Sequence, residues 1–145
     1  MAAPLLIAAD HAGFELKEAL KKALESRGVA YRDLGTHSLD SVDYPDFAHQ
    51  LAAAISKGEA ERGVLVCGTG TGMAISANRH RGVRAAVAYD QESAHLAREH
   101  NDANVLAIGA RLTTAYRAEL ILDTFLNTAF AGGRHERRVG KIETT

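Results

Sequence analysis

Hydrophobic residues along the chain form short apolar runs that alternate with longer stretches of helical periodicity. The runs suit buried strands and are too short for buried helices. Between Ala12 and Arg27 the period is helical, because Phe14, Leu16 and Leu20 share one stripe and lysines lie opposite. The pattern predicts strands over 5–9, 29–33, 64–66, 83–88 and 104–108, and helices over 12–27, 47–57, 73–79, 91–99 and 114–127.

Strand and helix alternate along the 145 residues, which is typical of a parallel sheet with helices on both faces. We therefore expect a single α/β domain over 1–145, with three α/β/α layers around a five-stranded, Rossmann-like parallel sheet and a basic C-terminal tail. Crossovers between the strands should be right-handed. Ligands of such folds bind beyond the carboxyl ends of the strands.

Turn and cap residues predict where several helices begin and end. Pro45 closes a polar loop over 34–44, and Asp46 is expected to cap the helix that follows. Asp90 is expected to cap the helix over 91–99 in the same way. His100 and Asn101 are expected to lie in the turn before the last strand.

The stretch with the most candidate chemistry is Gly63–Gly72, which reads GVLVCGTGTG. A short strand ends at Cys67, a glycine loop follows, and a helix is expected to start near Met73. Glycines let backbone N–H groups converge and a helix N-terminus adds positive potential, so this arrangement suits an anion. Cys67 has two interpretations: a small buried hydrophobe at the end of a strand, or a thiolate stabilised by the start of a helix.

Polar residues mark both edges of the predicted sheet. Asp10 and His11 come directly after the first strand, so they should lie at the same edge as Cys67. His100 and Asn101 precede the last strand and should lie at the opposite edge. Either they only form a turn, or a second subunit brings them to the site.

Composition narrows the class of protein. A formal net charge of -1 gives no field that would attract nucleic acid or an acidic membrane, so we expect neither as a partner. The one cysteine cannot form an internal disulfide, which favours a reducing, cytoplasmic location. No stretch approaches the ~20 apolar residues of a membrane span, and no signal peptide is evident.

The glycine loop lacks the other signatures of its fold class. A dinucleotide fingerprint needs glycine where Met73 stands, a cysteine phosphatase of the C-x5-R type needs arginine there, and a P-loop needs a Gly-Lys pair. No cluster of His, Cys, Asp and Glu has ligand spacing, so we expect no metal and no cofactor. A thiol base, converging N–H groups, histidines and a basic tail remain. Together they suit proton abstraction next to the carbonyl of a phosphorylated substrate.

Five motifs, in order along the chain, resemble the type B ribose-5-phosphate isomerase family. They are Asp10-His11-Ala-Gly-Phe, Tyr44-Pro45, Cys67-Gly-Thr-Gly-Thr-Gly, His100-Asn101-Asp102-Ala-Asn104-Val-Leu, and Gly132-Gly133-Arg134-His135 with Arg138. The resemblance covers nearly the whole chain. It implies interconversion of D-ribose 5-phosphate and D-ribulose 5-phosphate through a cis-enediol. It also implies a homodimer or tetramer whose sites are shared between subunits.

The resemblance further implies a role for each motif residue. Cys67 is the expected base between C1 and C2, and Thr69 assists it. His100 is expected to open the furanose ring, with Asp10 nearby in contact with the sugar. His135 should either touch the phosphate or stack within the tail. The other expected substrate contacts are the anion-binding loop residues Gly68, Gly70, Thr71 and Gly72, the phosphate ligands His11, Arg111, Arg134 and Arg138, and the sugar contacts Tyr44 and Asn101.

Several alternatives stay open at the level of sequence. One branch of the resembled family uses a glutamate of the glycine-loop helix as base, and Met73 stands at that position, so the chain fits the cysteine branch. The substrate could be a six-carbon phosphosugar such as allose 6-phosphate or galactose 6-phosphate. The chain could also be a non-catalytic phosphosugar-binding subunit. Taken singly, Asp10 could only cap a helix, His100 could only interact with a helix C-terminus, and the arginines of the tail could be a solvated charge run.

Overall fold

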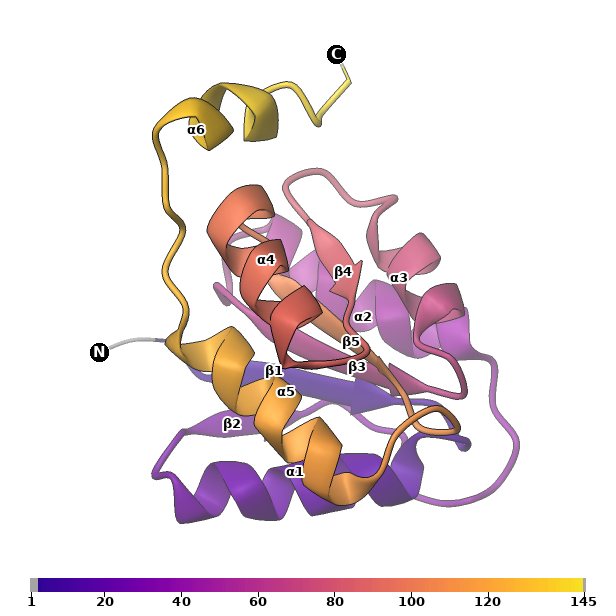
Figure 1. Cartoon of the computed structure of the whole chain (residues 1–145). Helices are drawn as coiled ribbons and strands as arrows, with labels where there is room; N and C mark the ends of the chain where they lie inside the picture. Colours follow the sequence, from indigo (N-terminus) through magenta and orange to yellow (C-terminus); the bar gives the residue numbers. More distant parts are fainter. Residues whose placement is uncertain (1–2, 145) are drawn as a thin grey trace.

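The chain folds around a five-stranded sheet that lies between two layers of helices (Figure 1). This computed structural model describes residues 3–144. The strands are β1 (Leu5–Ala9), β2 (Tyr31–Asp33), β3 (Gly63–Cys67), β4 (Ala85–Val87) and β5 (Val105–Gly109). The helices are α1 (Phe14–Ser26), α2 (Tyr44–Ser56), α3 (Thr71–Ala77), α4 (Gln91–Asn101), α5 (Ala115–Asn127) and α6 (Arg134–Val139). Neighbouring strands are parallel, in the order β2-β1-β3-β5-β4, which confirms the predicted fold class.

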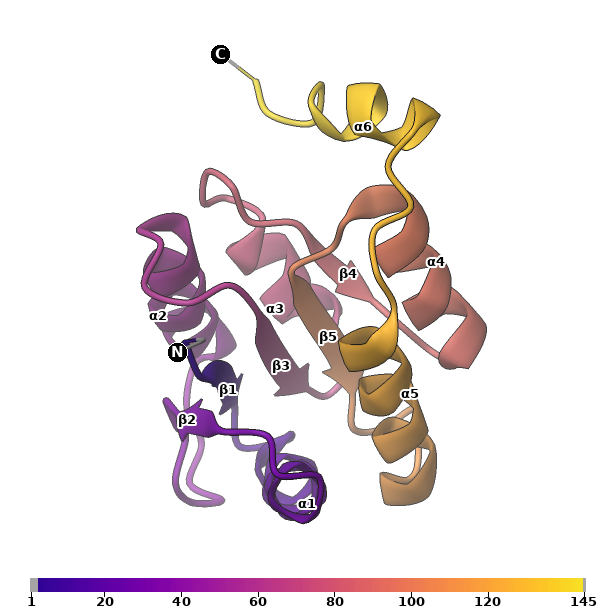
Figure 2. The ribbon, with the colours of Figure 1, turned by 90° about the vertical axis from the view of Figure 1, so that its left-hand side faces the viewer.

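Alternate side chains of each strand belong to two hydrophobic cores, one on each face of the sheet. On one face, Val64 and Val66 of β3 pack with apolar residues of α1, α4 and α5. On the other face, Leu65 and Cys67 pack with α2 and α3. Figure 2 shows the two helical layers on either side of the strands. Cys67 therefore lies on the face covered by α2 and α3, at the end of its strand.

The centre of the sheet contains the point where the strand order reverses. From β1 the chain continues to β2 on one side, whereas β3, β5 and β4 build the other side. The residues after β1 and β3 therefore border a crevice at the carboxyl ends of the strands, where ligands bind in folds of this class. Gly13 lets the turn after β1 approach β3 closely, because an added Cβ would lie 2.2 Å from the carbonyl oxygen of Val66.

The start of α2 differs from the sequence prediction. The helix begins at Tyr44, with Asp43 as its N-cap and Pro45 in its first turn. The prediction that Asp46 caps a helix from Phe47 is therefore wrong. Proline lacks an N–H that the first turn would leave unpaired, and its fixed φ suits that turn, so Pro45 starts the helix instead of closing the loop.

The end of α4 lies further along the chain than predicted. His100 and Asn101 form the last turn of the helix, and Asp102 ends it in the left-handed conformation, with φ 47°. The interpretation of His100 and Asn101 as turn residues is therefore wrong. The predicted cap at the start of α4 is confirmed, since the Asp90 carboxylate accepts the Ser93 N–H at 2.7 Å.

The C-terminal tail contains a short helix, α6, where the sequence predicts only turns. Figures 1 and 2 show α6 set apart from the sheet, beyond the ends at which the strands begin. None of its six residues is buried, so hydrophobic packing does not hold it in place. Within residues 3–144, the structure contains no helix with the length and hydropathy that a membrane span requires.

A lysine is fully buried between α1 and the end of β2. The Lys17 ammonium lies 2.5 Å from the Asp33 carboxylate and 3.0 Å from that of Glu18. Lys21 also reaches Asp33, at 2.9 Å. Burial by itself raises the pKa of the Asp33 carboxyl, but hydrogen bonds from both lysines and from the Gly35 N–H lower this pKa overall. The cluster ties α1 to β2 and to the loop that follows it.

We expect Lys17→Met to lower the free energy of unfolding by about 3 kcal/mol, because the variant leaves the Asp33 carboxylate desolvated and short of one cation. Lys21→Met is the matched control. Its side chain is 21% exposed, and its loss should cost about 1 kcal/mol. Urea unfolding followed by circular dichroism measures both values. Equal losses in the two variants would show that Lys17 is not the main partner of Asp33.

Candidate active site

A pocket of about 480 Å³ opens at the carboxyl ends of the central strands. It is bordered by the turn after β1, the start of α2, the glycine loop after β3 and the loop after β5. Each of these segments contains candidate residues predicted from the sequence, and the fold brings them together. The lining residues are Asp10, His11, Ala12, Tyr44, Cys67, Gly68, Thr69, Thr71, Gly72, Ile75 and Arg111.

Cys67 is only 4% exposed, yet it borders this pocket. Its Sγ accepts a hydrogen bond from the Gly70 N–H at 3.2 Å. A backbone N–H directed at sulfur is a donor whose hydrogen bond a thiolate can accept. The side chain therefore packs in the core with α2 and α3, as the first interpretation predicts, and it also borders the pocket, as the second requires.

The glycine loop depends on a residue without a side chain at its centre. Gly70 has φ +80°, and an added Cβ would lie 3.1 Å from the carbonyl carbon of Ile108. Gly70 shapes the loop but is not among the residues that line the pocket. Next to it, Thr69 Oγ1 accepts the Thr71 N–H at 3.3 Å, which leaves the hydrogen of the Thr69 hydroxyl available for donation.

Two further glycines leave room for side chains from other elements. The Arg111 guanidinium lies over Gly68, where an added Cβ would be 3.0 Å from Nη1. The Tyr44 ring lies over Gly72, where an added Cβ would be 2.6 Å from Cε1. The backbone N–H of Arg111 also donates a hydrogen bond to the Gly68 carbonyl, at 3.0 Å. The loop is therefore in contact with a cation and a phenol, which suit the anionic and hydroxyl groups of a sugar phosphate.

Asp10 and His11 are each oriented by a backbone N–H. Asp10 Oδ1 accepts the Gly13 N–H at 3.0 Å, so this carboxylate stabilises the turn before α1, although Gly13 is the N-cap residue. His11 Nδ1 accepts the Val42 N–H at 3.1 Å. A neutral imidazole that accepts at Nδ1 carries its hydrogen on Nε2. His11 can therefore donate from Nε2 to an anion.

The remaining predicted residues lie at the opposite end of the sheet. His100 and Asn101 are in the last turn of α4, and Arg134, His135 and Arg138 are on α6. Figure 2 shows α6 and the end of α4 beyond the strand ends that lie away from the arrowheads. The structure thus forms two groups of predicted residues, one around Cys67 and one around His100, and a single chain does not join them.

Sequence reasoning did not single out two residues that border the pocket, Ala12 and Ile75. Ile75 is 52% exposed, although it follows the buried residues Met73 and Ala74 on α3. Ala12 and Ile75 are both apolar, so their side chains carry no chemical signal of a site in the sequence.

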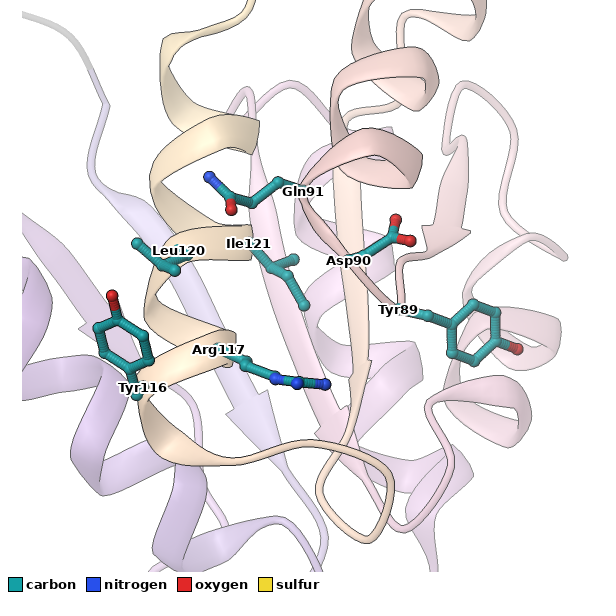
Figure 3. Close-up of a pocket in the computed structure, with 7 residues that line it drawn as sticks. All are labelled: Tyr89, Asp90, Gln91, Tyr116, Arg117, Leu120 and Ile121. Carbon is teal, nitrogen blue, oxygen red and sulfur yellow. The ribbon is translucent and has the colours of Figure 1, made fainter.

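A second hollow, of about 220 Å³, lies between the starts of α4 and α5 (Figure 3). Tyr89 and Tyr116 stand at its two sides, and Arg117 lies between them. Its one carboxylate, Asp90, already accepts an N–H of the first turn of α4. The residues that line this hollow include no thiol and no imidazole. The pocket around Cys67 is therefore the candidate active site.

The pocket combines a sulfur that accepts an N–H, a carboxylate, a glycine loop, an imidazole donor and a guanidinium. From residue 3 to residue 144, no group of three or more His, Cys, Asp or Glu side chains is placed to hold a metal ion. The fold and the pocket define a class: an α/β enzyme with an acid–base site for a small anionic, hydroxyl-bearing substrate.

Comparison with known proteins identifies the family within this class. The family model described as Ribose/Galactose Isomerase matches residues 5–142. Ribose-5-phosphate isomerase B of Escherichia coli is 46% identical over 133 residues, which are 92% of this chain and 89% of that protein. The chain therefore belongs to the Ribose/Galactose Isomerase family.

Solved structures agree with this assignment. A ribose 5-phosphate isomerase from Thermotoga maritima matches with a TM-score of 0.94 at 51% identity, over 98% of both chains. Ribose-5-phosphate isomerase B from Mycoplasma genitalium, with bound ribulose-5-phosphate, matches with a TM-score of 0.94 at 40% identity, over 98% of this chain and 95% of that one. These findings confirm the predicted family and, as the class of enzyme, an aldose–ketose isomerase.

Proposed function

We propose that this chain interconverts D-ribose 5-phosphate and D-ribulose 5-phosphate through an enediolate, with Cys67 as the base. The observation that carries the proposal is the Cys67 sulfur, which borders the pocket and accepts the Gly70 N–H at 3.2 Å. The relative from Mycoplasma genitalium, which is described with ribulose-5-phosphate bound, supports a five-carbon phosphosugar as the substrate.

Proton transfer begins on open-chain ribose 5-phosphate, which has its carbonyl at C1. The Cys67 thiolate takes the C2 proton, the electron pair of that bond forms the C1–C2 double bond, and O1 becomes an oxyanion. N–H groups of residues 68–72 stabilise this oxyanion, and one such preorganised donor is worth about 2.7–4 kcal/mol of barrier. A proton then passes from O2 to O1. The thiol returns its proton to C1 as O2 becomes the ketone carbonyl.

Thr69 is the proposed assistant in the transfer between the two oxygens. Its hydroxyl lies in the loop next to Cys67, and its hydrogen is available because Oγ1 accepts the Thr71 N–H. At the other end of the substrate, His11 and Arg111 are the proposed phosphate ligands of this chain. One is an oriented N–H donor and the other is a cation, and charge-assisted hydrogen bonds of this kind are strong.

The group around His100 is proposed to reach the pocket from a second copy of the chain. Its residues lie at the opposite end of the sheet, so an intact site needs an assembly. In a two-fold dimer the same surfaces meet in both directions, so each subunit would complete the pocket of the other. His100 and Asp10 would then open the furanose ring. Arg134 and Arg138 would bind the phosphate, and Asn101 the sugar.

The experiment that tests this function is the turnover of ribose 5-phosphate by the purified chain with EDTA present. We expect formation of ribulose 5-phosphate, with a larger kcat/KM than for allose 6-phosphate. The second candidate is an isomerase of a six-carbon phosphosugar, which the family description, Ribose/Galactose Isomerase, favours. Turnover of six-carbon phosphosugars alone would support that candidate. No turnover of either kind would support a non-catalytic subunit.

A further inference from the structure

Residues 128–140 form an arm that contains α6, and no buried apolar side chain of α6 holds this arm against the rest of the protein. None of Arg134–Val139 is buried. Gly132 and Gly133, which precede the helix, both have positive φ, at 67° and 56°. Glycine leaves the backbone freer than any other residue, so this pair can act as a hinge. Contacts of particular residues must therefore determine where α6 lies relative to α4.

Several contacts join the arm to α4. Near its start, the Thr128 carbonyl accepts a hydrogen bond from Arg98 Nε at 3.0 Å. The Ala131 N–H donates to the Glu99 carbonyl at 3.1 Å. Beyond the glycine pair, the imidazole of His135 stacks on that of His100, with 4.3 Å between the ring centroids and 15° between the ring planes. The stack is a contact with α4 beyond the hinge, because Ala131 precedes the glycines and His135 follows them. After α6, the Glu143 carboxylate also accepts the Gly82 N–H.

Partial burial and the surrounding charges lower the pKa of the His135 imidazole, which favours its neutral form. Partial burial is the largest cause, and His100 lowers this pKa further. Arg134 and Arg138 act in the same direction, whereas Glu99 raises this pKa. The Glu99 carboxylate also lies 3.6 Å from Nε2 of His100. A neutral ring can stack on His100 whether or not His100 is protonated, so the contact survives a proton transfer at His100.

We propose that His135 is a positioning residue that couples α6 to the end of α4, so that His100 and the two arginines of α6 act as one unit. This inference rests on the proposed function, in which that unit acts on a substrate at Cys67 of the partner subunit. Without the stack, the contacts that remain beyond the hinge lie after α6, from the Gly82 N–H to the Glu143 carboxylate and from Arg81 to the Thr144 carbonyl, so the glycine hinge lets α6 shift relative to α4. The phosphate then loses Arg134 and Arg138, and His100 loses the neighbour that holds its ring plane.

Kinetics of two variants separate stacking from direct contact with the phosphate. His135→Ala is expected to raise KM for ribose 5-phosphate by roughly 3- to 10-fold, which corresponds to the loss of one aromatic pair, and also to lower kcat. His135→Phe keeps a planar ring that cannot hydrogen-bond to phosphate, and it should restore most of both parameters. His49→Phe, an exposed position on α2, is the matched control with wild-type kinetics. Wild-type KM in His135→Ala, or a Phe variant as impaired as the Ala variant, would overturn the inference.

A second readout does not depend on turnover. A stacked aromatic ring shifts the proton signals of its neighbour upfield through its ring current. The Cε1–H signal of His100 in a ¹H–¹³C spectrum should therefore lose this upfield shift in His135→Ala. The signal should keep such a shift in His135→Phe. An unchanged His100 signal in the alanine variant would refute the stack, even in an inactive protein. A shifted signal together with a wild-type chain that turns over no ribose 5-phosphate would refute the proposed function instead.

Discussion

Replacing Cys67 with alanine is expected to lower kcat for ribose 5-phosphate by roughly 10²- to 10⁴-fold, the range typical of a lost general base. A methyl group cannot accept the C2 proton. The N–H groups of the glycine loop remain, because they belong to the backbone. KM should change little, since the proposed phosphate ligands do not include the sulfur. Initial rates of ribulose 5-phosphate formation, with EDTA present, give both parameters.

Cys67→Ser is the matched variant, because it keeps the size and polarity of the side chain but replaces the thiol with a far weaker acid. It should lose activity to a similar extent, since the hydroxyl is not ionised near neutral pH. Both variants should unfold in urea within about 1 kcal/mol of the wild type, which excludes misfolding as the cause. An alanine variant with wild-type kcat would remove Cys67 from the mechanism and leave the family assignment intact.

Mixing two inactive variants is expected to restore activity if the site is shared between subunits. Cys67→Ala lacks the base, and His100→Asn lacks the proposed ring-opening residue. In a mixed dimer one pocket combines the intact Cys67 of one subunit with the intact His100 of the other, while the second pocket lacks both. Random assembly makes half of the dimers mixed, so roughly a quarter of wild-type activity should return.

The two variants should be unfolded and refolded together, or co-expressed, so that subunits exchange. Each variant treated in the same way alone is the control and should stay inactive. A mixture of Cys67→Ala with Cys67→Ser is a further control, since no combination of those subunits contains the base. If the mixture of Cys67→Ala and His100→Asn stays at the level of its parents, His100 does not act in the pocket of a partner subunit.

Much of the fold could be predicted because the parallel strands are buried on both faces. Runs such as Leu5–Ala9 and Val64–Val66 therefore consist of apolar residues bounded by turns and helices, which is a strong signal. The Asp90 cap followed from local chemistry alone, since a carboxylate before a helix accepts a free N–H of the first turn. The position of Asp10 and Cys67 at the same edge of the sheet was predictable, because each residue stands at the carboxyl end of a parallel strand.

The errors occurred where two local signals compete. Pro45 is a loop residue by one rule and a helix-starting residue by another, and the structure follows the second. His100 and Asn101 read as a turn, yet the left-handed Asp102 lets α4 continue through both.

The placement of the tail could not be derived from its own residues. Arg134 and Arg138 are exposed, and no apolar pattern directs their helix to a particular surface. Their position depends on a glycine pair and on contacts across more than thirty residues of chain, such as the stack between His100 and His135 and the hydrogen bond from the Gly82 N–H to the Glu143 carboxylate. Pairwise contacts of this kind have no periodicity, so only the structure could reveal them.

The most direct test of the central claim is an NMR time course of ribose 5-phosphate in D₂O with the wild type and with Cys67→Ala. Removal of the C2 proton by a side chain exposes it to exchange with solvent. The wild type should therefore form ribulose 5-phosphate and, over many reversible turnovers at equilibrium, introduce deuterium at C2 of the ribose 5-phosphate. The alanine variant should do neither in the same time. Equilibrium reached by the wild type with no deuterium on carbon, or exchange by Cys67→Ala as fast as by the wild type, would contradict a thiolate base at Cys67.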